Sequence, residues 1–458
     1  MAKFFTWEDL KIAFSFFCCV YGIGTLGIPA NFARAGPVYA TIALLFMAFS
    51  NVCSCVAVSK VMLAAPKSVK TYGDLGEWCC GRFGRYIVVT AQFGVCLMVP
   101  CAFLVLGGIL LREIIPNAFS QQVWSVIMAL SLLPVILTPT LKEGAMAALA
   151  GCLGTVFADF IALFVLVDRI GDHPAVIAPE FKFKEVVATF GNLALAYSAA
   201  VLVPALQREH SQPERMPRVV GATMIFTSAL FLTIGVTAYH TVGCQVPGNL
   251  LFAIAGTSLN LNTSRSTIVL AYMFMQLHIT IAMSVILNPV LYIAERSLLG
   301  MHKRPRNTEE QIIDEESQVP FDGGLQTPPL KEKESMSEQR ASTRRSVVSL
   351  MDAERDSEVD LAAEYRDPKN IVKFVVLRCT IVGILLAFAV AFHDHFIDIS
   401  DFVGASAISM GCIILPIFFY LKTFWKKLPW YQRIIGSVII IVCGLCGGYM
   451  TYSSGKAL

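Results

Sequence analysis

The chain has 458 residues, of which 55% are hydrophobic and only 15% are charged, and its formal net charge is +3. Soluble globular proteins carry about 25% charged residues, so these values exclude water as the main solvent of the chain. The nearly balanced charge gives no sign of a nucleic-acid partner. Composition therefore predicts an integral protein of the lipid bilayer that binds no nucleic acid.

Apolar runs long enough to cross a bilayer recur along the chain, with short polar turns between them. A spanning helix needs about 20 apolar residues. In lipid, a segment that is not part of a closed barrel can satisfy its backbone hydrogen bonds only as a helix. We therefore predict an all-α polytopic membrane protein with about eleven transmembrane helices. The predicted spans cover residues 10–34, 38–62, 86–111, 123–138, 145–167, 186–206, 219–239, 267–294, 372–392, 402–424 and 434–452.

Lysine and arginine gather in the loops at one end of these spans, which predicts that this end faces the cytoplasm. They are Lys60, Lys67, Lys70, Arg82, Arg85, Lys142, Arg208, Arg215, Arg218, Lys422, Lys426, Lys427 and Arg433. The opposite loops are acidic or sparsely charged, and one holds a glycosylation candidate, Asn262, in an Asn-Thr-Ser sequon. The N-terminus is thus predicted to be cytoplasmic and the C-terminus extracellular or lumenal.

One hydrophilic segment interrupts the spans. Residues 295–370 are rich in Glu, Lys, Arg, Ser, Gln and Pro, which is the composition of disorder. The predicted organisation is therefore transmembrane helices 1–8 in residues 1–294, a disordered cytoplasmic loop in 295–370, and helices 9–11 in 371–458. A solvated tether and a regulatory segment both fit this loop.

The first span contains three glycines and a proline, in the sequence Gly-Ile-Gly-Thr-Leu-Gly-Ile-Pro at residues 22–29. Glycine tolerates unusual dihedral angles and proline lacks a donor, so this sequence predicts an unwound helix. Unwound backbone inside a membrane can hold a carboxylate on free N–H groups and an ammonium group or an ion on free C=O groups. Close helix packing through small residues is the alternative interpretation.

A second stretch of small residues, 191–205, lies five spans later and also contains a proline. The segments 26–30 and 201–205 can be aligned with each other, since each ends in proline followed by alanine. A shift of five spans inverts the membrane topology of the second copy. This weak symmetry is typical of transporters built from two inverted repeats.

These segments resemble the amino acid/auxin permease family. The glycine-rich sequence of residues 22–29, followed by Ala-Gly-Pro at 35–37, is similar to the family's first-helix signature. Residues 71–77, with Gly81 and Gly84, resemble the loop between its second and third helices. Residues 190–214 resemble its sixth helix and the loop that follows. The resemblance covers most of the first half of the chain, whereas the last three spans match in number and spacing.

The resemblance implies a permease of the APC type, in which helices 1–10 form a 5+5 inverted repeat with helices 1 and 6 broken. An amino acid would bind between the two broken helices, with Thr25, Tyr197 and Ser198 as the favoured side chains. The implied substrate-binding residues are Gly22, Ile23, Gly24, Thr25, Leu26, Gly27, Ala194, Ala196, Tyr197, Ser198 and Ala199. Family members occur in plasma membranes and in vacuolar or lysosomal membranes, so either location is implied.

The coupling ion is predicted from one departure from the family's pattern and from two titratable side chains. Sodium-coupled relatives are expected to carry an asparagine where this chain has Cys18 or an apolar neighbour, which favours protons over sodium. Asp159 and His278 lie inside predicted spans, where ionisable groups are costly and often functional, although each could instead serve only the structure. Thr280 and Ser284 are candidates for ion ligation or for helix packing.

Other classes of function fit the sequence less well. The seven histidines form no metal cluster or nucleophile–base pair, so neither an enzyme nor a metal site is predicted. The only cofactor expected is the coupling proton or sodium ion. Since neither broken segment carries a charged side chain, the substrate is predicted to have a neutral side chain. A nutrient sensor on a permease fold and a sodium-coupled carrier remain the alternatives.

Overall fold

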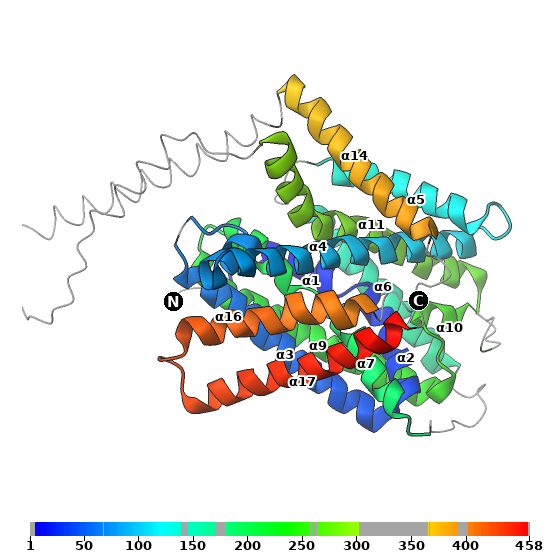
Figure 1. The fold of residues 1–458 in the computed structure, drawn as a ribbon. Helices are drawn as coiled ribbons and strands as arrows, with labels where there is room; N and C mark the ends of the chain where they lie inside the picture. The colour runs from blue at the N-terminus through cyan, green and yellow to red at the C-terminus, as the bar shows by residue number, and fades with distance from the viewer. Residues whose placement is uncertain are drawn as a thin grey trace, which may run out of the picture. The chain divides into compact units, whose positions relative to one another are not determined.

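A computed structural model describes residues 5–66, 68–138, 145–169, 180–255, 259, 263–301, 365, 367–391 and 402–456. The described part of the chain is helical and contains no strand (Figure 1). It forms two compact units, of which the larger combines Met1–Val290 with Thr380–Leu458 and the smaller is Leu291–Cys379. The glycosylation candidate Asn262 lies outside the described residues, and so does most of the predicted cytoplasmic loop.

The all-α polytopic fold predicted from the sequence is confirmed. In the described ranges, nine helices are long and apolar enough to cross a membrane, and the bent pair α1 and α2 adds a tenth. The predicted span at 123–138 forms a shorter apolar helix, so the count of eleven is not reached by length and composition. The main helices are α1 (Trp7–Val20), α2 (Ile23–Ala35), α3 (Pro37–Ala64), α4 (Tyr72–Ile114), α5 (Gln121–Ile136), α6 (Ala145–Asp168), α7 (Phe183–Ala196), α8 (Val203–Arg208), α9 (Met216–Val242), α10 (Leu250–Ile254), α11 (Arg265–Ala294), α14 (Pro368–Ala391), the π-helix η7 (Gly404–Ile414), α16 (Leu415–Phe424) and α17 (Trp430–Gly455).

The first span is broken near its middle. A capping box starts α1, because Thr6 accepts a hydrogen bond from the backbone of Asp9 while the Asp9 carboxylate accepts one from the backbone of Thr6. The helix ends at Val20, and α2 resumes at Ile23 after a bend of 46°. Only Tyr21 and Gly22 leave the helical path, so the unwinding is shorter than the glycine-rich sequence suggested.

The sixth span is broken as well. The helix α7 ends at Ala196, a turn follows, and a short 3₁₀ segment, η2 (Ala200–Leu202), leads into α8. The side-chain amide of Gln92 on α4 donates to the carbonyl oxygen of Val201 over 3.4 Å, which supplies a partner to backbone outside the regular helix.

The segment that resembled a loop between the second and third helices, residues 71–85, is mostly helical. A second capping box, formed by Thr71 and Asp74, begins α4 at Tyr72, far ahead of the predicted start of this span. The backbone then departs from helical geometry at Cys80 and at Gly81, whose φ of 68° favours glycine. The loop was expected here from the family resemblance, and the glycines Gly73, Gly76, Gly81 and Gly84, which lower helix propensity, do not prevent the helix.

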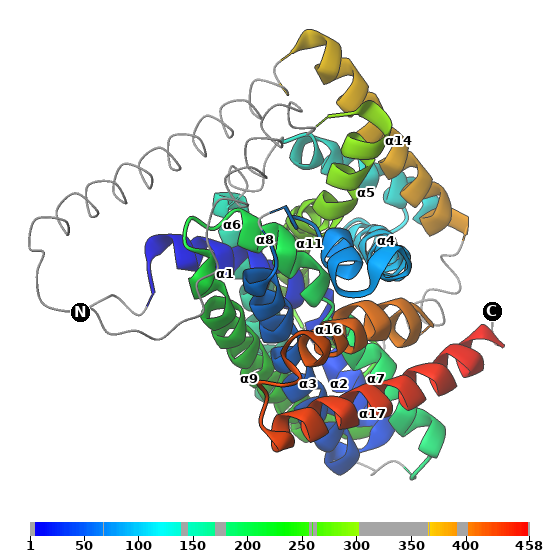
Figure 2. The same cartoon turned by 60° about the vertical axis from the view of Figure 1, so that its left-hand side comes forward.

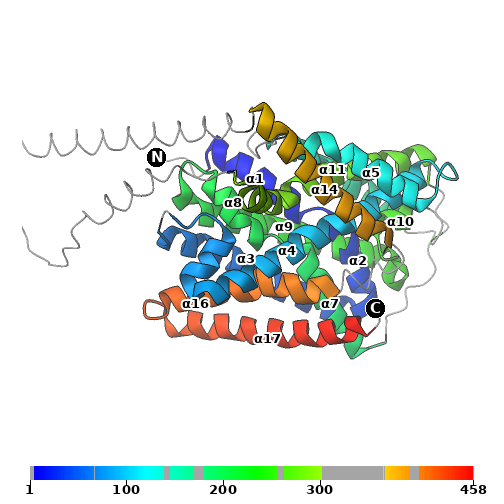
Figure 3. The same ribbon diagram turned by 45° about the horizontal axis from the view of Figure 1, so that its top comes forward.

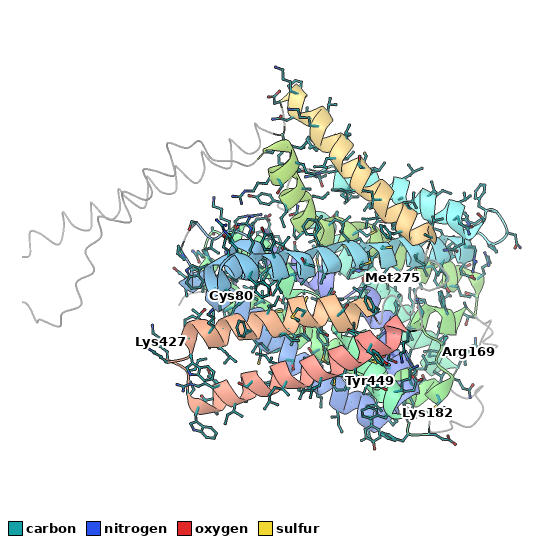
Figure 4. All side chains as sticks on the ribbon, in the orientation of Figure 1. Cys80, Arg169, Lys182, Met275, Lys427 and Tyr449 are labelled. Atoms are coloured by element: carbon teal, nitrogen blue, oxygen red, sulfur yellow. The ribbon has the colours of Figure 1, made fainter. Side chains whose placement is uncertain are left out.

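The two broken spans lie inside the larger unit, where other helices pack around them. The helix α2 packs on both α7 and α9, and α1 packs on α6 and α9. The turned view in Figure 2 shows α3 beside α9, and these two helices are in contact. Figures 1 and 3 both show α16 and α17 side by side near the C-terminus. Figure 4 shows Cys80 and Lys427 toward one end of these helices, and Arg169 and Lys182 toward the other.

The smaller unit contains a buried ion pair. The guanidinium of Arg378 donates from Nε to Glu295 Oε1 over 2.7 Å, and both side chains are almost completely buried. Tyr365, which lies within the predicted cytoplasmic loop, donates its hydroxyl to Glu295 Oε2 over 2.7 Å. These bonds give both oxygens of the carboxylate a partner within this unit.

Candidate functional site

The two broken spans touch each other directly between α2 and α7. A Cβ atom added to Gly24 would lie 2.7 Å from the Cα atom of Ala196, so only glycine allows this approach. A Cβ atom on Gly27 would lie 3.1 Å from Asn192 Oδ1, the same atom that accepts a hydrogen bond from Asn31 Nδ2 over 3.0 Å. Gly24 and Gly27 therefore serve close helix packing, while Gly22 belongs to the break.

Thr25 connects the break to Asp159 on α6. The Thr25 hydroxyl lies 2.8 Å from the carbonyl oxygen of Gly22 and 3.3 Å from Asp159 Oδ1, so both oxygens are within hydrogen-bond distance of it. Thr25 is completely buried and Asp159 is 2% exposed. The second carboxyl oxygen, Oδ2, is also buried and has no hydrogen-bond partner in the described part of the protein. Tyr21, the first residue of the break, interacts with the same carboxyl group.

His278 on α11 also lies against the break, at Gly22. A Cβ atom on Gly22 would lie 2.2 Å from His278 Nε2, so the imidazole occupies the space that a side chain at this position would need. His278 Nδ1 lies 3.2 Å from the carbonyl oxygen of Gly151, which can only accept a hydrogen bond. This assigns the proton of a neutral imidazole to Nδ1 and leaves Nε2 as an acceptor, for which the described residues provide no donor.

Tyr197 and Ser198 form the turn between α7 and η2. The Tyr197 hydroxyl donates to Ser228 Oγ on α9 over 2.9 Å, and the ring packs edge-on against Phe231 with centroids 5.0 Å apart. Phe231 also stacks on Tyr21, so an aromatic contact joins the two breaks. The amide of Ala199 donates to the carbonyl oxygen of Tyr197 over 2.7 Å, which tightens the turn.

The remaining predicted residues are four of the substrate-binding set and the two hydroxyl candidates for ion ligation. Ile23 begins α2, and Leu26, Ala194 and Ala196 are buried helical residues near the contact between α2 and α7. On α11 the Thr280 hydroxyl donates to the carbonyl oxygen of Gln276 over 2.9 Å. Ser284 donates to that of Ile281 over 2.7 Å, so both hydroxyls bond to their own helix. Their part in ion ligation stays a prediction.

Three side chains near the breaks were not selected from the sequence. Tyr21 sits beside Asp159, Asn31 bridges to Asn192, and Gln92 bonds to the backbone after the second break. Asn31 and Gln92 are amides within otherwise apolar spans, and such residues usually find a partner inside a helix bundle. That signal could have identified both of them. For the described residues, no group of three His, Cys, Asp or Glu side chains is arranged to hold a metal ion.

Comparison with known proteins agrees with this architecture. The family described as transmembrane amino acid transporter protein matches residues 9–455, almost the whole chain. The chain belongs to this family. It is 24% identical over 245 residues to amino acid transporter AVT1I of Arabidopsis thaliana, a match that covers 51% of this chain and 60% of that protein. This match therefore spans less than two thirds of the relative's length.

Two further similarities cover more of the chain. The vesicular inhibitory amino acid transporter of Homo sapiens is 20% identical over 447 residues, which is 93% of this chain and 71% of that protein. The crystal structure of MhsT in complex with L-phenylalanine superposes with a TM-score of 0.50 at 10% sequence identity, covering 96% of this chain and 98% of that one. At this identity the likeness concerns the fold alone.

Proposed function

We propose that the protein is a secondary active transporter of amino acids with neutral side chains, driven by protons and working by alternating access. The observation that carries this proposal is the buried Asp159 carboxyl group, which bonds to Thr25 at the break of the first span. Family membership supports amino acids as the substrates. Substrate recognition by backbone at the two breaks is supported by the absence of charged side chains from residues 21–22 and 197–199.

The hydrogen bonds of Thr25 suggest how a proton could act. A hydroxyl group has one proton, so Thr25 cannot donate to Gly22 and to an ionised Asp159 at the same time. If Asp159 is protonated, it can donate to Thr25 Oγ1 while Thr25 donates to the Gly22 carbonyl, and both bonds form together. Loss of the proton makes the two acceptors compete, which would loosen either the break or its connection to α6. Protonation of Asp159 would thereby favour one arrangement of the broken helix.

The protein's membrane and orientation are part of the same proposal. Relatives are named vesicular and vacuolar transporters, which supports an organelle membrane, and a plasma membrane remains compatible with the family. Lys60 of α3 lies near Tyr420 of α16, and Lys422 of α16 lies near Cys80 of α4, so these two lysines share one end of the larger unit. By the bias of Lys and Arg toward the cytoplasm, this end would face the cytosol.

Uptake into proteoliposomes tests the proposal. Purified protein is supplied with labelled neutral amino acids under an inward proton gradient, and separately under a sodium gradient. We expect accumulation driven by protons, and its loss in Asp159→Asn, because the amide can bond to Thr25 but cannot release a proton. Asp168→Asn is the matched control, since this carboxylate ends the same helix with its side chain 58% exposed. Accumulation driven only by sodium would indicate a sodium-coupled carrier, and bound ligand without transport would indicate a sensor.

A further inference from the structure

The turn between α16 and α17 concentrates positive charge. Residues 402–458 contain no Asp or Glu, and four of their five Lys and Arg residues lie between positions 422 and 433. These four are Lys422, Lys426, Lys427 and Arg433, of which the lysines are exposed and Arg433 is half-buried. Among the residues that the structure describes, none of the four forms an ion pair. The charge of this turn is therefore available to a partner outside the described part of the chain.

Two further cations lie beside the turn. The ammonium group of Lys422 is 3.6 Å from Cys80 Sγ on α4, and Arg82 follows two residues later. Lys60 of α3 lies over the Tyr420 ring of α16, with its nitrogen 5.9 Å from the ring centroid. Lys60 and Arg82 are both exposed, and within the described ranges neither forms an ion pair.

The acidic residues nearest to Arg82 in the sequence already have a cationic partner. Asp74 and Glu77 both pair with Arg85, and Asp74 also caps the start of α4. These three charges therefore interact mainly with one another. They leave the six cations around the turn without local compensation from this part of α4.

The backbone of the turn is fixed by its own hydrogen bonds. The amides of Lys427 and Leu428 donate to the carbonyl oxygen of Phe424 over 2.8 and 3.0 Å. Arg433 Nε donates to the carbonyl oxygen of Leu428 over 3.0 Å, and its guanidinium carbon lies 5.3 Å from the centroid of the Trp425 ring. A binding partner would thus meet a turn whose backbone is already ordered, which lowers the entropic cost of binding.

Aromatic side chains place this turn at the surface of the membrane. Trp425 is 48% exposed, Trp430 72% and Tyr431 50%. Tryptophan and tyrosine are enriched where the acyl chains meet the headgroups, and the turn joins two helices that are long and apolar enough to span the bilayer. The cations of the turn therefore belong at the level of the lipid headgroups.

We infer that this surface binds the headgroup of an anionic membrane lipid, and that it prefers a headgroup with a phosphomonoester to one with a single negative charge. The surface, called the basic surface below, consists of Lys60, Arg82, Lys422, Lys426, Lys427 and Arg433. Clusters of Lys and Arg next to spanning helices attract anionic lipids, and a phosphomonoester carries a charge of about −1.5 to −2 at pH 7. A lipid also fits the exposed tryptophans, along which its acyl chains would lie.

Such a lipid would contact several helices of the larger unit at once. Lys60 belongs to α3, Arg82 to α4 and Lys422 to α16, and Arg433 lies on α17. The inference draws on the proposed cytosolic orientation of this end only for which leaflet supplies the lipid. It is independent of the transported substrate and of the coupling ion, so binding can succeed or fail separately from transport.

Lipid binding by the purified full chain tests the inference. The probe is a short-chain phosphatidylinositol phosphate with a fluorophore on one acyl chain, added to the protein in neutral detergent and followed by fluorescence anisotropy. We expect saturable binding that weakens when NaCl rises from 0.1 to 0.5 M, because salt screens exposed charges. Phosphatidylserine with the same label should bind more weakly. These measurements use the unmodified sequence and do not depend on how any variant folds.

A pair of substitutions locates the site. Lys426→Gln together with Lys427→Gln should weaken binding by about tenfold or more, given about fivefold for each basic residue near a membrane surface. Lys182→Gln together with Lys184→Gln is the matched control, because these two exposed lysines lie between exposed phenylalanines at the start of α7, and Figure 4 shows Lys182 toward the other end of the molecule. The control pair should leave the affinity unchanged.

A soluble inositol phosphate without acyl chains distinguishes a lipid site from a site for free phosphate. It should compete at least tenfold more weakly than the lipid, since it cannot use Trp425 and Trp430. Competition equal to that of the lipid would overturn the assignment to a lipid. Absence of saturable binding, phosphatidylserine binding as tight as that of the phosphomonoester lipid, or an equal loss of affinity in the two lysine pairs would overturn the inference as well.

Discussion

The hydroxyl of Thr25 joins the break of the first span to the carboxyl group of Asp159, at 3.3 Å, from inside a fully buried site. Removing the hydroxyl in Thr25→Val leaves acceptors at Gly22 and Asp159 without this donor. We expect the variant to lose about 1–3 kcal/mol of unfolding free energy, the cost of a buried polar group that loses its partner. Thr25→Ser should retain most of the stability, because serine keeps the hydroxyl.

Thr155→Val on α6 is the control for this prediction. Thr155 is equally buried, but among the residues that the structure describes its hydroxyl bonds only to the carbonyl oxygen of Gly151 in its own helix, over 3.3 Å. That carbonyl also serves the helix, so the expected cost is below about 1 kcal/mol. Thermal unfolding in detergent ranks the variants. Equal destabilisation by Thr25→Val and Thr155→Val would contradict the special role of Thr25.

Gly22 and His278 should behave as a coupled pair. In Gly22→Ala the new methyl group would lie 2.2 Å from His278 Nε2, which forces the ring or the break to move. Overpacking of this kind costs about 1–3 kcal/mol. In a His278→Ala background the same substitution should be tolerated better, with an interaction energy above about 0.5 kcal/mol. The measurement is a double-mutant cycle of unfolding free energy.

A matched glycine outside the site provides the reference. Gly444 lies in the exposed face of α17, and a Cβ atom there meets nothing within 4 Å. Gly444→Ala should be neutral or slightly stabilising, since alanine is the better helix former. Independent, additive effects of Gly22→Ala and His278→Ala would show that the contact between them is unimportant.

The glycine-rich sequence of the first span shows what the sequence could and could not predict. Unwinding and close packing were both open interpretations of residues 22–29. In the structure each interpretation holds for different glycines of this stretch. Gly22 is part of the break, while Gly24 and Gly27 stay helical and pack on α7. Composition and proline identify the span as irregular. Which glycine is unwound depends on tertiary neighbours, such as His278 and Ala196, that no local pattern contains.

The two buried ionisable groups of the site could be identified from the sequence, but their neighbours in the fold could not. Asp159 and His278 stood out because charge at membrane depth is costly. Their placement beside the break, Asp159 at Thr25 and His278 at Gly22, required the packing of α6 and α11 against the first span. The start of α4 was predicted too late, because the Thr71 and Asp74 capping box outweighs the low helix propensity of the glycines that follow.

Asp9 at the start of α1 should contribute strongly to stability. Its carboxylate accepts hydrogen bonds from Arg215 Nη2 over 2.6 Å and from His210 over 2.8 Å, and its side chain has no solvent exposure. These bonds connect the beginning of the first span to the segment that precedes α9. Asp9→Asn is expected to cost about 3 kcal/mol, since one member of a buried charged pair is neutralised.

Glu8 provides the comparison for Asp9. It is the neighbouring acidic residue and bonds to Ser211 at the same surface, but its side chain is 37% exposed. Glu8→Gln should cost less than about 1 kcal/mol, as is usual for exposed charges. The measurement is the unfolding free energy of the two variants. A larger loss in Glu8→Gln than in Asp9→Asn would contradict the prediction that Asp9 contributes more to stability.

The ion pair of Glu295 and Arg378 makes a fourth prediction, within the smaller unit. Arg378→Met leaves the buried carboxylate without its charged partner, which should cost about 3–5 kcal/mol. Tyr365→Phe removes one hydrogen bond to the same carboxylate and should cost about 2 kcal/mol. Unfolding of both variants in detergent is the measurement. A smaller loss in Arg378→Met than in Tyr365→Phe would show that the pair adds little to this unit.

The central claim, that amino acid movement carries protons through Asp159, is tested most directly by substrate-induced proton entry. Proteoliposomes with an entrapped pH indicator receive neutral amino acids outside, with no proton gradient imposed and the membrane potential held negative inside. We predict acidification of the lumen together with amino acid uptake, and no acidification with Asp159→Asn. Uptake without acidification, or acidification that Asp159→Asn leaves unchanged, would contradict the proposed mechanism.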